Sequence, residues 1–414
     1  MASSSGLLPS EPRTLPSTGF QVVDASETIE EETLPGYHLG KYYPVRLGEI
    51  FDKRYRVVGK LGYGTTSTVW LAHDSVESRY VALKLYVANL NNTRELKAYE
   101  CLDEADEKDH PGKTLIRKLL GSFQVDSHSS NGSSSHLCLV HEPLGPSLKE
   151  ILDLMPPYSF HLGFLRPVLR NILIAVDFLH ARAGIIHSDL QIANFICDVR
   201  SSDKAMFAKF ENAEFTQPTP RKIISEEHII YTSRRMSLSK ALPLLCDFGE
   251  TRLFSEAGTP GEDIMPNVYK APEVIMHMEW DYKVDVWNVA MVVWHSLTGR
   301  PLFNGRSADG KIQDDRIHMA EMVALMGPPP LRFLERSTRM TRALWNEDGN
   351  WKNVAPIPDI TLEKLGADIN GYDKEGFFLF FRRMLRWLPE DRPTCEELVY
   401  DPWLMRELGL GLGR

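Results

Sequence analysis

The fold of this chain is decided by His187-Ser188-Asp189-Leu190-Gln191-Ile192-Ala193-Asn194-Phe195. The stretch follows an apolar run with the character of a helix, residues 164–179. The Asp189 carboxylate can accept a proton from an attacking hydroxyl, and the Asn194 side chain can hold a metal ion that neutralises phosphate charge. The H-x-D-x-x-x-x-N pattern thus indicates a catalytic loop for phosphoryl transfer. Because the pattern also arises by chance, the other motifs of the chain must show whether this interpretation holds.

A glycine-rich turn lies earlier in the chain, between two predicted strands, at Leu61-Gly62-Tyr63-Gly64-Thr65-Thr66-Ser67. Its two glycines let the backbone approach a phosphate closely enough for N–H groups to bond the oxygens. Ser67 occupies the third position of the G-x-G-x-x-G pattern, and a plain hairpin turn looks much the same. The following strand, Val81-Ala82-Leu83-Lys84, matches the V-A-[IL]-K pattern of a phosphate-binding lysine. The alternative for Lys84 is a solvated lysine at a sheet edge.

A lysine in that place needs a carboxylate partner, and the predicted helix over residues 94–102 offers two. Apolar residues three, four and seven positions after Glu95 share its helical face. Glu100 lies off that face. We therefore expect Glu95 to point inward and to hold Lys84.

Three further features follow along the chain. Asp247-Phe248-Gly249 ends an apolar predicted strand, where an aspartate can coordinate Mg²⁺ bridging the β- and γ-phosphates. Glu273 of an Ala-Pro-Glu triplet is expected to form a buried ion pair with Arg392. Asp285 opens an apolar predicted helix and is expected to brace the backbone of the catalytic loop.

The composition limits which classes of protein and site the chain can form. The 414 residues are 43% hydrophobic, enough for one large domain or a two-lobed one. A net charge of −9 argues against nucleic-acid binding through a generally basic surface. The five cysteines have no C-x-x-C spacing, so neither a zinc site nor a disulfide framework is expected. No apolar stretch has the length of a membrane span, and no secretory signal is expected.

Together these motifs stand in the right order across residues 55–398, and the sequence resembles the eukaryotic protein kinases. Within them it is similar to the SR-protein kinases of the CMGC group. The closer resemblance rests on residues 43–49, residues 67–72, the interruption between Asn194 and Asp247, and Tyr269 before Ala-Pro-Glu. It covers nearly all the chain after residue 37.

The resemblance implies roles for the site residues. Asp189 is the expected catalytic base, and Asn194 and Asp247 are the expected Mg²⁺ ligands. Lys84, held by Glu95, is expected to contact the α- and β-phosphates of ATP. Gln191 replaces the lysine that contacts the γ-phosphate in the family. The remaining nucleotide contacts fall to Gly62 and Gly64 over the phosphates and to Leu61, Val69, Ala82, Glu142 and Leu144.

The resemblance also implies a fold, a reaction and partners. The expected fold is α+β and bilobal, with a small antiparallel β-sheet lobe and a larger, mainly helical lobe. The expected reaction transfers the ATP γ-phosphate to serine in basic, Arg-Ser-rich proteins such as splicing factors. We expect a monomer that is cytoplasmic and nuclear, with no direct contact to nucleic acid or membrane.

The expected organisation begins with a disordered tail, because residues 1–36 are rich in Ser, Pro, Thr and Glu. An ordered lead-in over residues 37–54 precedes the small lobe. The later boundaries are 55–143 for the small lobe, 144–408 for the large lobe with an insert at 196–243, and 409–414 for a C-terminal tail. The insert is too short and polar for a core of its own. Residues 127–135 are expected to form a flexible loop between strands.

Four departures from the family pattern bear on activity. Ser188 replaces the arginine that pairs with a phosphorylated activation loop, so no such phosphorylation is expected, as in the SR-protein kinases. Gln191 supplies no charge, which favours slower transfer. Lys270 replaces an arginine and loses its planar fork. Ile317 and Ala324 stand where docking carboxylates are expected.

Two alternative functions remain at this point. A non-catalytic pseudokinase that binds partners and nucleotide would fit Gln191 and Ser67. A small-molecule kinase of the aminoglycoside or choline type also uses H-x-D-x-x-x-x-N. Glu273 and Arg392 argue against the second, because they build a peptide platform that those enzymes lack.

Overall fold

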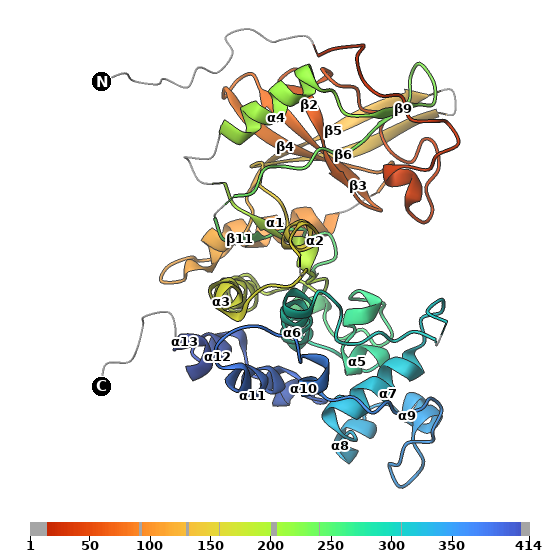
Figure 1. The fold of residues 1–414 in the computed structure, drawn as a ribbon, viewed down its shortest axis with the longest axis vertical. Helices are drawn as coiled ribbons and strands as arrows, with labels where there is room; N and C mark the ends of the chain where they lie inside the picture. The colour runs from red at the N-terminus through yellow and green to blue at the C-terminus, as the bar shows by residue number, and fades with distance from the viewer. Residues whose placement is uncertain are drawn as a thin grey trace. The chain divides into compact units, whose positions relative to one another are not determined.

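The structure is a computed structural model that describes residues 15–90, 93–129, 132–156, 158–199, 205–239, 241–307 and 309–406. The chain divides into two compact units. The first contains residues 1–92, 117–146 and 197–241, and the second contains residues 93–116, 147–196 and 242–414. Each unit is therefore assembled from segments that are distant in the sequence (Figure 1).

The first unit is built on a six-stranded antiparallel sheet with the order β1-β2-β3-β4-β6-β5. The strands are β1 (Ile50–Phe51), β2 (Tyr55–Tyr63), β3 (Ser67–Asp74), β4 (Arg79–Tyr86), β5 (Leu119–Ser129) and β6 (Gly132–His141). The small antiparallel sheet predicted from the sequence is confirmed. The flexible loop predicted at 127–135 is wrong where the structure describes it, because the pairing continues as far as Ser129 and Gly132.

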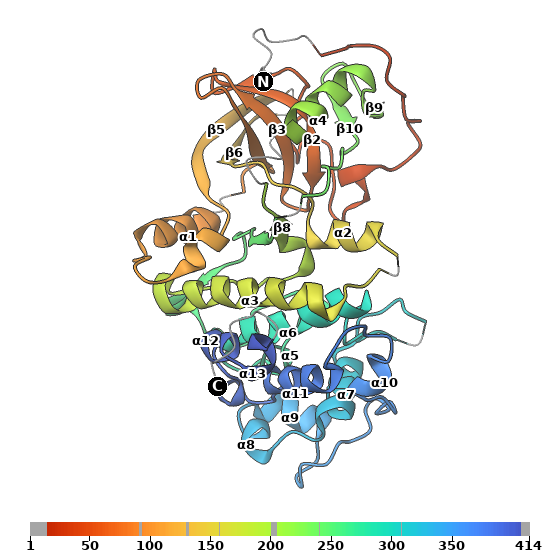
Figure 2. The same cartoon turned by 60° about the vertical axis from the view of Figure 1, so that its left-hand side comes forward.

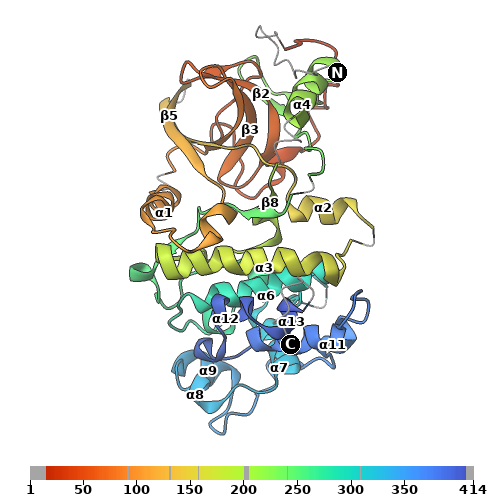
Figure 3. The same ribbon diagram turned by 90° about the vertical axis from the view of Figure 1, so that its left-hand side faces the viewer.

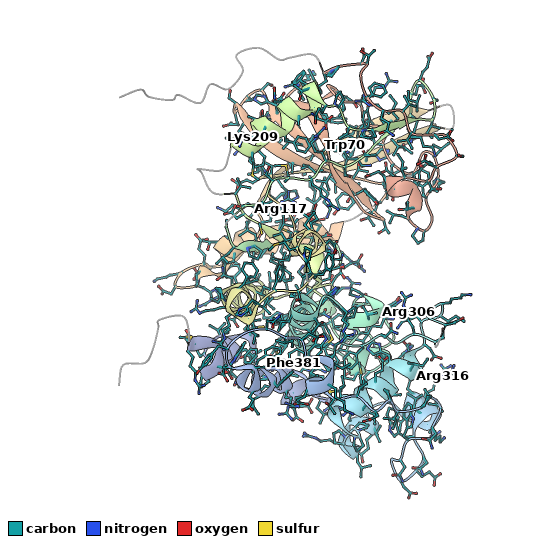
Figure 4. The ribbon with its side chains drawn as sticks, in the orientation of Figure 1. Trp70, Arg117, Lys209, Arg306, Arg316 and Phe381 are labelled. Carbon is teal, nitrogen blue, oxygen red and sulfur yellow. The ribbon has the colours of Figure 1, made fainter. Side chains whose placement is uncertain are left out.

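Both faces of this sheet are buried, as neighbouring residues of one strand show. On β3, Trp70 belongs to one apolar cluster, with Val57 and Tyr231, while Leu71 belongs to another, with Val58. Because successive side chains in a strand point to opposite faces, the two clusters cover opposite sides of the sheet. Figure 4 shows Trp70 among the strands.

The insert supplies part of this covering. It forms α4 (Ala205–Thr216), β9 (Arg221–Ile223) and β10 (Ile229–Tyr231). Three apolar side chains of α4 pack on the sheet: Met206, Phe207 and Phe210. The insert, predicted within the large lobe, therefore belongs to the first unit (Figure 1). The insert needs no separate core, because its apolar residues complete the core of the sheet.

Residues 15–36 are also ordered, which contradicts the predicted disordered tail in this range. Val22 forms a parallel bridge with Arg221, and the short 3₁₀ helix η1 (Glu30–Thr33) reaches β2. Glu31 forms an ion pair with the fully buried side chain of Lys60, and Glu30 lies 3.3 Å from the same nitrogen. Residues 1–14 of that predicted tail, and the C-terminal tail 409–414, lie outside the described residues.

The second unit is mainly helical, as predicted for the large lobe. It also contains α1, which was predicted in the small lobe. Its longer helices are α1 (Thr93–Glu104), α2 (Leu148–Leu154), α3 (Leu162–Phe178), α6 (Lys283–Thr298), α7 (Asp315–Met326), α9 (Thr338–Leu344) and α11 (Lys374–Met384). The short ones are α5 (Pro272–Ile275), α8 (Leu331–Leu334), α10 (Leu362–Leu365), α12 (Cys395–Val399) and α13 (Pro402–Met405).

The core of this unit lies around α6, which is buried on all sides over most of its length. A helix that is apolar all round must be enclosed by other elements. Helix α3 lies along it (Figure 2), and α12 packs on α3 (Figure 3). Helix α6 ends at Gly299, whose φ of 70° suits glycine at a helix C-terminus.

Short strands and turns connect these helices near the catalytic-loop sequence. They are β7 (Ile185–Ile186), the 3₁₀ turn η4 (Ile192–Asn194), β8 (Phe195–Cys197), β11 (Pro243–Leu245) and β12 (Arg252–Leu253). β7 pairs with β12, and β8 pairs with β11. Among the described residues, every helix is too short or too polar to traverse a lipid bilayer.

We expect Glu31→Ala to destabilise the first unit by about 2–3 kcal/mol, because it leaves the buried Lys60 ammonium with Glu30 and one carbonyl as partners. Urea denaturation measures the change. The control is Glu27→Ala, which removes an exposed carboxylate and should cost less than about 0.5 kcal/mol. Equal midpoints for the two variants would contradict the role of the Lys60–Glu31 pair.

Candidate functional site

The catalytic-loop residues of the second unit are held by one buried carboxylate. Asp285, near the start of α6, accepts hydrogen bonds from the backbone N–H groups of His187 and Ser188 at 2.8 and 2.9 Å. The His180 Nε2 atom lies 2.9 Å from the same side chain. The predicted bracing of the loop by Asp285 is confirmed. The bracing also holds Ser188 at a φ of 58°, a conformation that non-glycine residues rarely adopt.

The loop fixes the Asp189 side chain beside Gln191. The Gln191 amide nitrogen lies 3.3 and 3.2 Å from the two Asp189 oxygens and donates to them. Burial raises the pKa of the Asp189 carboxyl above its ordinary value. The His187 ring and the Gln191 amide oppose this rise in pKa, whereas the carboxylates of Asp247 and Glu250 add to it. A carboxylate with a raised pKa is a better proton acceptor.

Asn194 and Asp247 are connected to the same loop. The Asn194 side-chain nitrogen donates to the Asp189 carbonyl at 2.8 Å, which leaves the side-chain oxygen as the group able to bind a metal. The Asn194 carbonyl accepts the N–H of Cys246, the residue before Asp247, at 2.9 Å. One amide oxygen and one carboxylate suit Mg²⁺, which takes few protein ligands and completes its shell with phosphate oxygens and water.

Phe248 connects the Asp247 segment to α1. Its ring is buried and contacts the rings of Tyr99 and His187, each with a centroid distance of 5.4 Å. Glu95 lies on the same helix as Tyr99 and is also buried, as the sequence predicted. The second unit thus brings together the catalytic loop, the Asp-Phe-Gly segment and the helix that carries Glu95.

The predicted ion pair of Glu273 and Arg392 is present and fully buried. Two parallel hydrogen bonds of 2.7 and 2.6 Å join the guanidinium to the carboxylate. Arg392 also donates to the carbonyls of Lys283 and Arg386. A bidentate pair whose other donors are also satisfied fixes geometry. It ties α5 to the start of α6, close to Asp285.

The first unit carries the nucleotide-binding residues predicted from the glycine-rich turn. The sheet register pairs Val69 with Lys84 across β3 and β4, and Gly62 with Val69 across β2 and β3. Lys84 is buried, as is Ala82 on the same strand. The sheet therefore brings the turn and the lysine to neighbouring strands.

The glycines leave space beside the turn. A Cβ atom added at Gly62 would meet no atom within 4 Å, and one at Gly64 would meet only the Ser67 carbonyl at 4.0 Å. Packing within the chain therefore does not require glycine at either position. The open space suits a phosphate that approaches the backbone closely, so the residues present fit ATP.

Glu142 and Leu144, the nucleotide contacts predicted just after β6, differ in exposure. Leu144 is buried, Glu142 is exposed, and Arg117 donates to the Glu142 carbonyl at 3.1 Å. Leu61 is half-buried on β2. Lys84 and Glu95 belong to different units, so their predicted pairing stays a prediction.

Sequence reasoning missed two residues that hold the site. The Tyr42 hydroxyl donates to the carbonyls of Gly64 and Thr65 at 3.0 and 3.2 Å, and so supports the glycine-rich turn. The Ser188 hydroxyl donates to the Glu250 carbonyl at 2.5 Å. Tyr42 precedes residues 43–49, on which the family resemblance rests, and Ser188 differs from the family pattern, so neither position carries a motif that indicates its hydrogen bond.

Comparison with known proteins gives a family match and several relatives. The model of the protein kinase domain matches residues 55–404. A serine/threonine protein kinase of Aspergillus fumigatus is 37% identical over 404 residues, which cover 96% of each chain. SRSF protein kinase 3 of Mus musculus is 32% identical, with 92% of this chain and 91% of the relative covered.

Two further similarities agree with these. The serine/threonine-protein kinase SRPK of Physarum polycephalum is 29% identical, with 91% of each chain covered. A crystal structure of a kinase domain superposes with a TM-score of 0.66 at 24% identity. It covers 88% of this chain and 99% of that structure, and it supports the fold alone.

We expect Asp285→Asn to lower the free energy of unfolding by about 2–3 kcal/mol, because an amide cannot accept from both loop N–H groups and His180. Urea denaturation measures the change. The control, Asp153→Asn, breaks an exposed ion pair with Lys149 and should cost under about 0.5 kcal/mol. An Asp285→Asn variant as stable as this control would contradict the bracing.

Proposed function

We propose that this chain, which belongs to the protein kinase family and is a serine/threonine kinase of the SR-protein kinase type, phosphorylates serines in Arg-Ser-rich proteins with Mg-ATP. The observation that carries the proposal is the Asp189 carboxylate, held by Gln191 on a loop that Asp285 braces. A fixed carboxylate beside Asn194 is what proton transfer from a hydroxyl requires.

In the proposed mechanism the chain positions the reactants and moves one proton. Asp189 orients the serine hydroxyl of the substrate and accepts its proton as that oxygen bonds to the γ-phosphorus of ATP. The bond from this phosphorus to the bridging oxygen breaks at the same time, and ADP leaves. Asn194 and Asp247 would hold Mg²⁺, and Lys84, paired with Glu95, would hold the phosphates. Bound Mg-ATP supplies the phosphoryl group, and the metal supplies positive charge. Catalysis then comes from positioning and electrostatic stabilisation.

Gln191 has two effects in this proposal. Its amide donates to both Asp189 oxygens, so it orients the base in place of a lysine. It also lowers the pKa of Asp189 without adding a formal charge. A lysine there would add a positive charge near the transferred phosphoryl group, which stabilises the charge of the transition state.

The substrate class is supported chiefly by the relatives, two of which are named for SR proteins or SR splicing factors. The acids in and next to α7 give weaker support, because two of them bond within the chain. The carboxylate of Asp314, the N-cap of α7, pairs with Arg316 at 2.6 Å, and Glu321 accepts the N–H groups of Asn304 and Gly305. Ile317 and Ala324 add no charge. Figure 4 labels Arg316 on α7.

The resemblance to SR-protein kinases also supports residence in both the cytoplasm and the nucleus.

We expect phosphate transfer from Mg-ATP to an Arg-Ser repeat peptide, in preference to a basic serine peptide without repeats. Radiolabel transfer measures both rates. Asp189→Ala should lower kcat by at least about 10³-fold, because the proton acceptor is lost, while nucleotide binding persists.

Equal use of both peptides would keep the kinase and exclude the Arg-Ser preference. Nucleotide binding without transfer to any protein or peptide would favour a pseudokinase. Normal turnover by Asp189→Ala would overturn the assignment of the base.

We expect substitutions at Gln191 to move the acid limb of the pH–rate profile. Asp189 must be deprotonated to accept a proton, so activity falls as the pH drops through its pKa. Gln191→Leu removes a bond that lowers this pKa, so the acid limb should move to higher pH. Gln191→Lys should move it to lower pH and preserve or raise kcat. Profiles of kcat over about pH 4–8 test this, and an unmoved limb in both variants would contradict it.

A further inference from the structure

A group of charged side chains in the second unit joins α1, β12 and the chain segment after β12. The carboxylate of Glu262, in that segment, accepts from Arg252 of β12 through Nε at 2.8 Å and Nη2 at 2.5 Å. Arg94 of α1 lies 4.0 Å from the same carboxylate oxygen. One carboxylate thus lies between arginines from two elements.

Arg252 connects Glu262 to the catalytic loop. Its side chain is 5% exposed, and its Nη1 donates to the Glu250 carbonyl at 2.5 Å. The same carbonyl accepts the Ser188 hydroxyl, also at 2.5 Å. Backbone pairing of β12 with β7 holds Arg252 opposite Ile186. A continuous series of contacts therefore runs from Glu262 to the residue before Asp189.

Arg94 extends the series toward α1. It precedes Glu95, and its Nη1 lies 3.5 Å from a Glu250 carboxylate oxygen. Its side chain is 47% exposed, so water screens these contacts. The pair of Arg252 and Glu262 is more sheltered and has two charge-assisted hydrogen bonds, so it is the stronger link.

We propose that Glu262 is a positioning residue that serves as the built-in anion of this segment. In kinases switched on by phosphorylation, new contacts between arginines and a phosphate order the corresponding segment. Here the carboxylate of Glu262 holds Arg252 and faces Arg94, so the segment is ordered without a phosphate. This inference rests on the proposed function, because it concerns how the same catalytic loop is held.

The surroundings of Glu262 make the idea testable with free anions. A hollow of about 340 Å³ is lined by Arg94, Lys97, Arg252, Glu256, Thr259 and Glu262. Removal of the Glu262 carboxylate leaves three cationic side chains around a space that a small anion can enter. Acetate or inorganic phosphate should then take the place of the missing group.

The experiment compares Glu262→Ala, Glu262→Asp and the control Glu256→Ala in the full chain. Glu256 lines the same hollow and accepts a 3.4 Å hydrogen bond from the Leu253 N–H. We expect Glu262→Ala to lower kcat about tenfold or more with little change in the KM for ATP, and Glu262→Asp to keep most activity. Glu256→Ala should stay within about twofold of the unchanged chain.

Added acetate or phosphate should restore the Glu262→Ala variant by about threefold or more, and should not raise the rate of Glu256→Ala. Hydrogen exchange of residues 254–266 gives a second readout. The segment should lose protection in Glu262→Ala and regain it with the anion.

Three results would overturn the proposal: unchanged kcat in Glu262→Ala, a loss that no anion restores, or loss of activity when phosphatase removes a phosphate from Thr259 of the unchanged chain. If the unchanged chain phosphorylates no substrate, the proposed function fails. Hydrogen exchange still decides the role of Glu262 in that case.

Discussion

The arrangement of the second unit depends on the Asp285 carboxylate, which is fully buried at the start of α6 and accepts two backbone N–H groups of the catalytic loop. Helix α6 is buried over most of its length, so the loop is fixed to an element that its neighbours enclose. The neighbouring pair of Glu273 and Arg392 fixes α5 to the start of the same helix. Loop, core helix and α5 are thus held together by buried, fully hydrogen-bonded charges, which are costly to rearrange.

The first unit uses a buried charge for a different purpose. Lys60 lies in β2, next to the glycine-rich turn, and its partners come from the N-terminal segment and the insert: Glu31, Glu30 and the Tyr231 carbonyl. Lys222 of the insert in turn bonds Glu32 at 2.8 Å. Two segments outside the minimal sheet are thereby fastened to the strand that precedes the phosphate-binding turn. Tyr42, which also precedes β2 in the sequence, supports the turn itself through its hydrogen bond to the Gly64 carbonyl.

Much of the fold and of the candidate site could be predicted because its signals are local. Apolar strands, the helical face of Glu95 and the spacing of Asp189 and Asn194 each occupy a few consecutive residues. The bracing by Asp285 and the pair of Glu273 and Arg392 followed from the order of motifs. The order of residues 15–36 was not predictable, because a Ser- and Glu-rich stretch gains its order from distant residues such as Lys60, Arg221 and Lys222. The place of the insert was missed for the same reason, since its apolar residues are few and complete another segment's core.

A crystal structure with Mg²⁺ and a non-hydrolysable ATP analogue would test the roles of these residues together. We expect a metal ion bound by Asp247 and the Asn194 side-chain oxygen, phosphates beneath Gly62 and Gly64, and an ion pair of Lys84 and Glu95. Asp189 should face open space beside the terminal phosphate and keep its bonds to Gln191. A nucleotide bound without metal at Asp247, or with Lys84 turned away from the phosphates, would contradict these roles.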